Sequence, residues 1–159
     1  MKLSDSIVII PTFNEKENIE RMIEKVFSLK KSFHVLIVDD GSPDGTADIV
    51  KKLQEKFTNQ LHILERQGKQ GLGTAYIAGF RWALQRDYEY IFEMDADFSH
   101  NPEDLERLYE ACAVKGADVS VGSRYVNGGK VENWPIGRIM MSYFASVYVR
   151  IVLGVGIKD

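Results

Sequence analysis

Two carboxylates separated by one residue, Asp95 and Asp97, follow the apolar run 90–94. Acids at positions i and i+2 just past a strand can share one hard cation, such as Mg²⁺ or Mn²⁺, through oxygen ligation. Ser99 offers a neutral oxygen to the same site, whereas His100 is expected in solvent because hard cations prefer oxygen to imidazole. The D-x-D pattern is short and common, so a loop of solvated acids at a helix entry is an equal alternative.

A second acidic pair, Asp39 and Asp40, ends the apolar run 34–40 and precedes several turn residues. Adjacent acids at a strand tip need partners, and a carboxylate there can accept hydrogen bonds from a nucleobase. Guanine offers two neighbouring N–H donors for this purpose. We therefore expect Asp40 to face a base, whereas Asp44 and Thr46 are expected to cap the helix that follows.

The segment 10–19, IPTFNEKENI, carries polar residues just after the first apolar run. Asn14, with Glu17 three residues later, has the spacing of a capping box. Glu15 lies near the same helix start, where the helix dipole favours a negative charge. Phe13 is an aromatic residue in a loop, and it is either a packing residue or a platform beneath a nucleobase.

The segment 65–80, ERQGKQGLGTAYIAGF, is rich in glycine and carries basic residues. It lacks the dinucleotide fingerprint, because Tyr76 stands where the third glycine after Gly71 and Gly73 belongs. Hydride transfer is therefore not expected. Lys69 can approach a phosphate beside this loop, with the two glycines permitting a close approach. A flexible turn without a ligand is an equal alternative.

Two arginines, Arg124 and Arg138, lie at either side of the glycine-containing loop in 122–138. Guanidinium groups match phosphate oxygens, so this pair is a candidate phosphate clamp. The segment 139–156 is apolar around most of its circumference, is short for a membrane span and is interrupted by Arg150. It is expected to be a core helix, with a helix resting in a membrane interface as the alternative.

The elements that must position these residues are strands alternating with helices. Five apolar runs of strand length are predicted as strands: 6–11, 34–40, 61–65, 90–94 and 118–122. The runs are nearly continuous in Val, Ile and Leu, which indicates a parallel sheet covered on both faces. Helical spacing between them predicts an open α/β sheet, whose ligands collect at the carboxyl ends of the strands. The candidate residues all fall at that edge.

The bulk composition limits the classes of protein that fit. The chain has 159 residues, 45% of them hydrophobic, which suits one globular core. Its formal net charge is −3, so no nucleic-acid partner is expected. The single cysteine, Cys112, excludes an internal disulfide and is expected to be a small core residue.

Five blocks in order along the chain resemble the family 2 glycosyltransferases, in particular their polyprenol- and dolichol-phosphate mannosyltransferases. The blocks are IPTFNEKENI, VDDGSPDGTADIV, GLGTAYIAGF, MDADFSHNPEDL and VGSRYVNGGKVENWPIGR, and they cover nearly the whole chain. The resemblance implies a GT-A fold, an open and mostly parallel Rossmann-like sheet with helices on both faces. It also implies inverting, metal-dependent transfer of mannose from GDP-mannose to a polyprenyl phosphate, with Mg²⁺ or Mn²⁺ as cofactor. Such an enzyme works at the cytoplasmic face of a membrane, with peripheral membrane contact.

Carried over by position, the resemblance assigns a guanosine pocket to residues of the first two blocks: Pro11, Phe13, Glu15, Val38 and Asp40. It places the diphosphate at Asp95, Ala96 and Asp97, and the metal on Asp95, Asp97 and Ser99. It implies that Arg124 and Arg138 face the phosphates of donor and acceptor. No catalytic base is assigned, because a phosphate monoester with a second pKa of about 6 is already anionic at neutral pH.

Members of the resembled family continue past a segment like the final IKD, whereas this chain stops at Asp159. We therefore expect residues 1–159 to be a single GT-A domain that is truncated at its C-terminal end. Two alternatives stay open: transfer from a UDP-sugar such as UDP-glucose to the same lipid, and a nucleotide-binding fragment without catalysis. A hydrolase is disfavoured, because the first strand lacks the aspartate that would act as its nucleophile.

Overall fold

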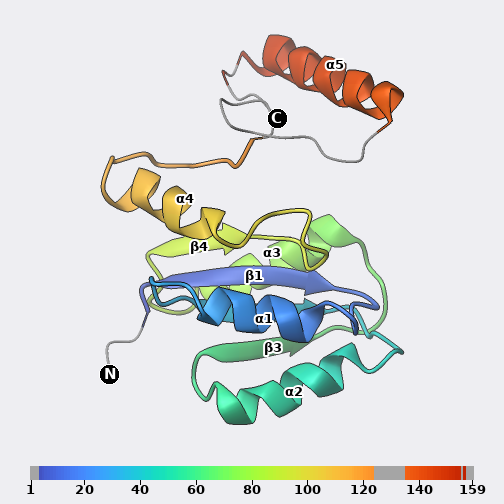
Figure 1. Ribbon diagram of the computed structural model, residues 1–159, viewed down its shortest axis with the longest axis vertical. Coiled ribbons are helices and arrows are strands. Elements are labelled where there is room, and N and C mark those ends of the chain that lie inside the picture. Colours follow the sequence, from blue (N-terminus) through green and yellow to red (C-terminus); the bar gives the residue numbers. More distant parts are fainter. Residues whose placement is uncertain (1–3, 124–134, 155, 157–159) are drawn as a thin grey trace. The chain divides into compact units, whose positions relative to one another are not determined.

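The computed structural model describes residues 4–123, 135–154 and 156, and the chain forms two compact units, residues 1–109 and residues 110–159. In the first unit, four described strands form an all-parallel sheet in the order β3-β2-β1-β4 (Figure 1). Their bounds are β1 Ser6–Thr12, β2 His34–Asp39, β3 Leu61–Glu65 and β4 Tyr90–Glu93. The expectation of a single domain over 1–159 stays a prediction.

Helices cover both faces of this sheet. They are α1 Ile19–Phe27, α2 Thr46–Lys56, α3 Leu72–Ala83 and α4 Asp104–Ala113. Along β1, Val8 and Ile10 pack with residues of α1 and α2, whereas Ile7 and Ile9 pack with residues of α3. Figure 1 shows α1 and α3 on opposite faces of the sheet. Because alternate side chains of one strand point to opposite faces, both faces need apolar residues. This explains the continuous hydrophobic runs and confirms the predicted open α/β sheet.

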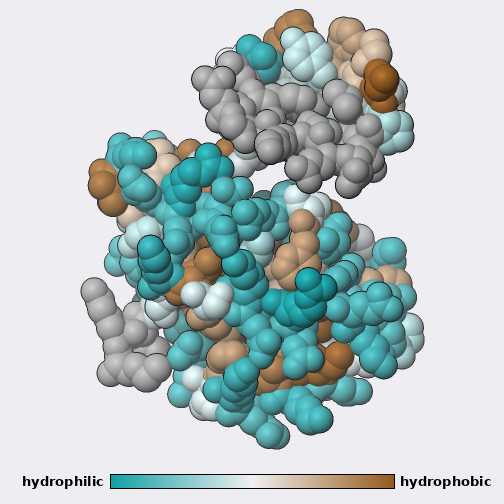
Figure 2. Space-filling view, in the orientation of Figure 1, coloured by the Kyte–Doolittle hydropathy of each residue, from teal (hydrophilic) through white to brown (hydrophobic). Residues whose placement is uncertain are grey.

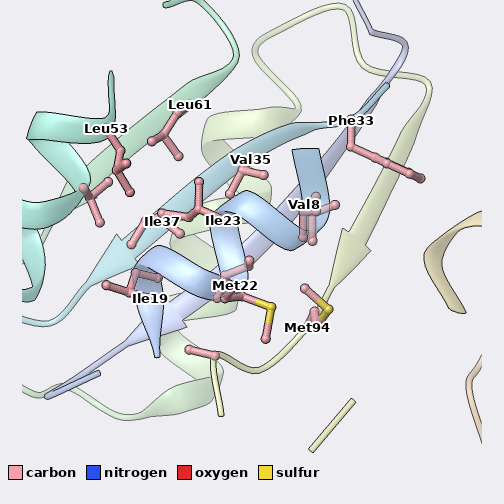
Figure 3. Packing of buried hydrophobic residues seen from close by; sticks show 14 of the residues in the cluster. Val8, Ile19, Met22, Ile23, Phe33, Val35, Ile37, Leu53, Leu61 and Met94 are labelled. Carbon is pink, nitrogen blue, oxygen red and sulfur yellow. The ribbon is translucent and has the colours of Figure 1, made fainter. Parts of the chain in front are cut away.

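The larger core cluster lies between the sheet and the helices α1 and α2 (Figure 3). Four α1 side chains have no exposed surface: Ile19, Met22, Ile23 and Val26. They follow one stripe of the helix and meet Val35 and Ile37 of β2. Met94 and Ala96, from the segment after β4, belong to the same cluster. The core therefore extends directly beneath the predicted acidic turn.

The predicted fifth strand, 118–122, is wrong. Residues 119–122 have no regular secondary structure, and the side chains of Val119 and Val121 are 75% and 51% exposed. An apolar run becomes a strand only when a neighbouring strand supplies its hydrogen bonds. In the part of the chain that the structure describes, no such partner pairs with this run.

The second unit contains the helix α5 Ile136–Leu153. Its apolar side chains are largely exposed, among them Met141, Phe144 and Ile151, and hydrophobic colours reach the surface there (Figure 2). The expectation of a core helix, with a helix resting in a membrane interface as its alternative, stays a prediction. A helix that is apolar all round needs partners on every side to be buried. None of the described helices is long and apolar enough to cross a membrane.

Gly79 is the contact point between α3 and β1. It is buried, and a Cβ built on it would lie 2.5 Å from Cγ2 of Ile9. Ile9 has no exposed surface and cannot move aside freely. We expect Gly79→Ala to lower the free energy of unfolding by about 1–3 kcal/mol, because overpacking outweighs the better helix propensity of alanine. Urea unfolding followed by circular dichroism measures the change.

Gly73→Ala is the matched control in the same helix. A Cβ at Gly73 would meet no atom within 4 Å. Alanine there should leave the protein as stable or raise its free energy of unfolding by up to about 1 kcal/mol. Equal effects of the two substitutions would contradict the close contact of α3 with β1.

Candidate functional site

A cleft with a volume of about 280 Å³ opens at the carboxyl ends of β1, β2 and β4. Its lining comes from four separate parts of the chain: Pro11, Thr12, Phe13, Glu15, Asp40, Lys69, Gly71, Leu72, Ala75, Asp95, Ala96 and Asp97. Strand β1 lies between β2 and β4, so the chain order reverses at this point of the sheet. Open α/β sheets bind ligands at such a switch point. The predicted edge is therefore the edge that carries the cleft.

The loop after β1 is fastened to the loop after β2 by three consecutive backbone N–H groups. The N–H of Asn14 donates to Ser42 Oγ at 3.0 Å, and the N–H of Glu15 donates to Thr46 Oγ1 at 3.1 Å. The N–H of Lys16 donates to Asp44 Oδ2 at 3.0 Å. These bonds fix the position of Glu15 at the rim of the cleft.

The predicted capping box of Asn14 and Glu17 is wrong. Asn14 has φ 61°, in the left-handed region, and α1 begins only at Ile19 after Asn18. Asparagine tolerates this conformation, which turns the following N–H groups toward the neighbouring loop. The predicted caps of α2, Asp44 and Thr46, are also wrong: Gly45 is the N-cap residue and no side chain caps this helix. Asp44 Oδ1 instead accepts the backbone N–H of Thr46, the first residue of α2, at 3.0 Å.

Asp39 and Asp40 have separate partners. Asp39 is 1% exposed and accepts hydrogen bonds from Thr12 Oγ1 at 2.9 Å and from the N–H and hydroxyl of Ser42 at 2.9 and 2.6 Å. It is a structural residue that joins the tips of β1 and β2. Asp40 is the acid that reaches the cleft.

Asp40 forms a two-pronged ion pair with Arg66, which follows β3. Arg66 Nε lies 2.6 Å from Oδ1 and Nη2 lies 2.8 Å from Oδ2, with the two side chains 9% and 7% exposed. The N–H of Gln70 also donates to Oδ2 at 3.2 Å. The Arg66 guanidinium holds the pKa of Asp40 below its ordinary value, against the opposing effect of burial. Asp40 therefore faces the cleft with only part of its accepting capacity free for a base.

Lys69 and Phe13 face each other in the cleft. Lys69 Nζ lies 4.8 Å from the centroid of the Phe13 ring. Both residues line the cleft, and Phe13 is half-buried. An aromatic face that carries a cation suits a flat, electron-rich ligand ring or a phosphate next to it. This arrangement favours the binding alternative over simple packing for both residues.

The turn after β4 is anchored from beneath by Met94 and Ala96, which are 2% and 3% exposed. Asp95 is half-buried and Asp97 is exposed, and both line the cleft. Asp97 Oδ1 accepts the backbone N–H of Ser99 at 2.9 Å. Burial raises the pKa of Asp97, but hydrogen bonds from Ser99 and the nearby His100 together bring the pKa below its ordinary value. Asp97 is therefore ionised at neutral pH.

Tyr76 of α3 contacts the acidic turn from the other face of the sheet. Its hydroxyl donates to Asp95 Oδ1 at 3.0 Å. Burial and the neighbouring charge of Asp95 raise the pKa of Tyr76 far above its ordinary value, and Glu93 and Asp97 add to the effect. Burial, with Asp95, also raises the pKa of Glu93. This end of the cleft is therefore strongly negative.

The charge of the cleft is unevenly divided. It is lined by four carboxylates and one lysine: Glu15, Asp40, Asp95, Asp97 and Lys69. Arg66 neutralises Asp40, whereas neither Asp95 nor Asp97 forms an ion pair with any residue that the structure describes. Two unpaired carboxylates with oxygen donors only fit a hard divalent cation. No three acidic, histidine or cysteine side chains in the described part are grouped to hold an ion.

The structure brings most of the predicted site residues into one cleft: Pro11, Phe13, Glu15, Asp40, Lys69, Asp95, Ala96 and Asp97. Val38 is absent from the lining, because it has no exposed surface and packs in the cluster beneath α3. Ser99 contacts Asp97 but does not line the cleft. Arg124 lies outside the described residues, and so does the side chain of Arg138. The roles predicted for these four residues stay predictions.

Sequence reasoning missed the partners of the two cleft acids, Arg66 for Asp40 and Tyr76 for Asp95. Each pair joins residues that are 26 and 19 positions apart, respectively. The available signal was the stretch that contains both, ERQGKQGLGTAYIAGF, which is too polar at its start for simple packing. The sequence alone does not show that Arg66 and Tyr76 of this stretch contact the acids, because these contacts form only in the folded sheet.

A model of the family described as Glycosyl transferase family 2 matches residues 7–154. Polyprenol monophosphomannose synthase of Mycolicibacterium smegmatis is 49% identical over 97% of this chain and 58% of its own length. Undecaprenyl-phosphate mannosyltransferase of Micrococcus luteus is 48% identical over 96% of this chain and 62% of its own length. Dolichol-phosphate mannosyltransferase of Pyrococcus furiosus is 39% identical over 96% of this chain and 42% of its own length.

The chain thus spans about half of the length of these curated relatives, between 42% and 62%. Among solved structures, S. aureus TarS 1-349 in complex with UDP is similar with a TM-score of 0.54 and 21% identity, over 76% of this chain and 39% of that one. TarS 1-349 without the nucleotide gives a TM-score of 0.57 at 22% identity. This likeness concerns the fold alone, and the fold is of the GT-A type.

Proposed function

Because the chain belongs to glycosyl transferase family 2, we propose that it carries the donor site of a mannosyltransferase. The donor is GDP-mannose, the acceptor is a polyprenyl phosphate, and the transfer inverts the sugar carbon and depends on Mg²⁺ or Mn²⁺. Three relatives named as polyprenol-, undecaprenyl- or dolichol-phosphate mannose-transferring enzymes support this choice. The lipid acceptor implies work at a membrane surface, which we assign to the cytoplasmic face.

The observation that carries the proposal is the single cleft shared by Phe13, Asp40, Asp95 and Asp97. One end offers an aromatic ring and a hydrogen-bond acceptor, which suit a nucleobase. The other end offers two unpaired carboxylates, which suit a cation bound to a diphosphate. The first turn of α3, which has no side-chain cap, borders the cleft at Leu72 and adds backbone N–H groups for phosphate oxygens.

The reaction can be written from these parts. An anionic oxygen of the acceptor phosphate forms a bond to C1 of mannose, while the bond from C1 to the diphosphate oxygen breaks. The electron pair leaves with GDP, and the configuration at C1 inverts. A divalent cation, when bound, supplies neutralisation of the leaving diphosphate. Asp95 and Asp97 would hold that cation in place, and Lys69 faces the phosphates. Arg124 and Arg138 are assigned to the phosphates of donor and acceptor.

Two other functions make different use of the same cleft. A UDP-sugar donor would use the same two carboxylates for its cation but would place uracil instead of guanine beside Asp40. Asp40 has limited capacity to accept hydrogen bonds there, because it is paired with Arg66. A nucleotide-binding protein without catalysis would use both ends and transfer nothing. The binding of nucleotides separates the first alternative, and transfer of the sugar separates the second.

The test of the donor site is the calorimetric affinity of the chain for GDP and for UDP, each with Mn²⁺ and with EDTA. We expect GDP to bind more tightly than UDP, and Mn²⁺ to strengthen GDP binding. Preference for UDP would replace mannose transfer by the UDP-sugar alternative. Equal affinity in Mn²⁺ and EDTA would contradict metal-dependent transfer.

Transfer itself is tested with the longest natural chain that contains these residues. Labelled GDP-mannose and a polyprenyl phosphate should give a labelled, organic-extractable lipid that releases its label in mild acid. Tight GDP binding without any such product, from this or another sugar nucleotide, would favour the nucleotide-binding alternative.

A further inference from the structure

Tyr76 links the back of the sheet to the acidic turn. It lies in α3 and packs against the second core cluster, which contains Ile9 and Ala75. Its hydroxyl donates to Asp95 Oδ1 at 3.0 Å. The ring is therefore held by the core while its polar end contacts a residue of the cleft.

This contact determines how Asp95 is presented. Oδ1 accepts the Tyr76 hydroxyl, whereas Oδ2 accepts no hydrogen bond from the described residues. A tyrosine side chain has only two rotatable bonds before its ring, so a ring packed in the core aims its hydroxyl accurately. The hydrogen bond thereby restrains the orientation of the carboxylate and leaves its other oxygen without a donor among the described residues.

The neighbouring acid has a different support. Asp97 accepts the N–H of Ser99 two residues later, so a local turn is enough to orient it. Asp95 depends on a residue 19 positions earlier and on the packing of α3 against β1. The two acids of the D-x-D pattern thus have one local and one tertiary support.

We propose that Tyr76 is a positioning residue for the metal, whose hydroxyl orients Asp95 so that its free oxygen meets a divalent cation shared with Asp97. The inference rests on the proposed function, because it assigns the support of the same metal site. It also accounts for the tyrosine in GLGTAYIAGF, at the position where a dinucleotide fingerprint has glycine. Hydrogen-bond partners that orient metal ligands contribute roughly 10- to 100-fold to metal affinity.

The experiment compares Tyr76→Phe with the unaltered chain in the calorimetric GDP assay, in Mn²⁺ and in EDTA. The substitution removes one hydroxyl and keeps the packed ring. We expect GDP affinity in Mn²⁺ to fall about 10-fold, in line with the loss of a ligand-orienting partner, and affinity in EDTA to stay unchanged. A merely structural role would lower both affinities, so the ratio between the two conditions is the decisive quantity.

Tyr88→Phe is the matched control. Tyr88 is also half-buried, and its hydroxyl is hydrogen-bonded to one side chain, with 2.7 Å between the hydroxyl oxygen and His34 Nδ1. Burial raises its pKa too. Its contacts His34 and Trp82 do not line the cleft, so loss of its hydroxyl should leave the ratio of GDP affinities in Mn²⁺ and EDTA unchanged. Thermal unfolding of both variants reports any general loss of stability.

The outcomes separate the two proposals. If the unaltered chain binds GDP more tightly with Mn²⁺ and Tyr76→Phe keeps the full effect, the role of Tyr76 is wrong and the metal-dependent donor site stands. If Tyr76→Phe and Tyr88→Phe reduce the ratio equally, the role of Tyr76 is also wrong. If Mn²⁺ has no effect on the unaltered chain, both the proposed function and this inference are overturned.

Discussion

Asp97→Ala should lower the affinity of the chain for GDP in Mn²⁺ by about 100-fold or more, because a direct ligand contributes at least as much as an orienting partner. Asp97 lines the cleft and is exposed, and its depressed pKa keeps it charged at neutral pH. Without it, Asp95 alone would have to hold the cation. The affinity in EDTA should be unchanged or slightly higher, since one negative charge near the diphosphate is gone.

Asp87→Ala is the control for this substitution. Asp87 is exposed, lies in the turn between α3 and β4, and does not line the cleft. It removes the same charge from the chain, so it separates a local ligand from a general change in net charge. An unchanged affinity of Asp97→Ala in Mn²⁺ would assign the acids of this turn to solvent, the alternative that the sequence left open.

Arg66→Met is expected to destabilise the protein by about 3–5 kcal/mol, because it leaves a buried carboxylate without its partner. Asp40 is 7% exposed at its side chain and Arg66 is 9% exposed. Methionine fills much of the space of the arginine stem, so the loss is one of charge and hydrogen bonds rather than volume. Urea unfolding at pH 7 measures the free energy of unfolding.

The pH dependence of the same variant gives an independent check. In the unaltered protein the pKa of Asp40 is below its unfolded value, so its stabilisation is present above that unfolded value and is lost as the pH falls through the folded pKa. In Arg66→Met, burial without a partner raises the pKa of Asp40 instead. The variant then gains stability relative to the unaltered protein as the pH is lowered from 7 toward 4.

Two further variants define the cause. Arg66→Met combined with Asp40→Asn removes both charges and should recover much of the lost stability. Lys51→Met removes an exposed pair, Lys51 Nζ with Glu65 Oε2 at 2.8 Å, whose side chains are 47% and 49% exposed. It should change the stability little. Equal losses from Arg66→Met and Lys51→Met would contradict the buried status of the Asp40 pair.

The sequence predicted the sheet well where apolar runs are supported by neighbours. The runs at 6–11, 34–40, 61–65 and 90–94 contain the strands β1, β2, β3 and β4, with small differences at their ends. Residue type is enough for β1 and β2, because strands buried on both faces are apolar almost throughout, and the half-buried strands β3 and β4 keep mostly apolar runs. The run 118–122 has the same local pattern and is not a strand, since pairing is a property of two segments.

In the candidate site, too, some features were predictable from residue type and others depended on distant contacts. The residue types of Asp95, Asp97, Asp40 and Phe13, and their places at strand ends, were sufficient to predict that they meet at one edge. The helix start at Asn14 was predicted wrongly, because its backbone lies in the left-handed region, with its N–H bonded to Ser42 Oγ, a side chain 28 positions later. A local pattern contains no information on such a distant competitor.

By itself, therefore, the sequence determined the α/β class, the family and the acids that converge at the carboxyl edge of the sheet. Only the tertiary structure decided how each acid is used. In the folded protein, Asp39 accepts a structural hydrogen bond from Thr12, and Asp40 forms an ion pair with Arg66. Asp95 accepts the Tyr76 hydroxyl with one oxygen, and its other oxygen is available. The physical reason is that a carboxylate's role depends on which donors surround it. Those donors come from segments that meet only after the strands have aligned and the helices have packed against both faces.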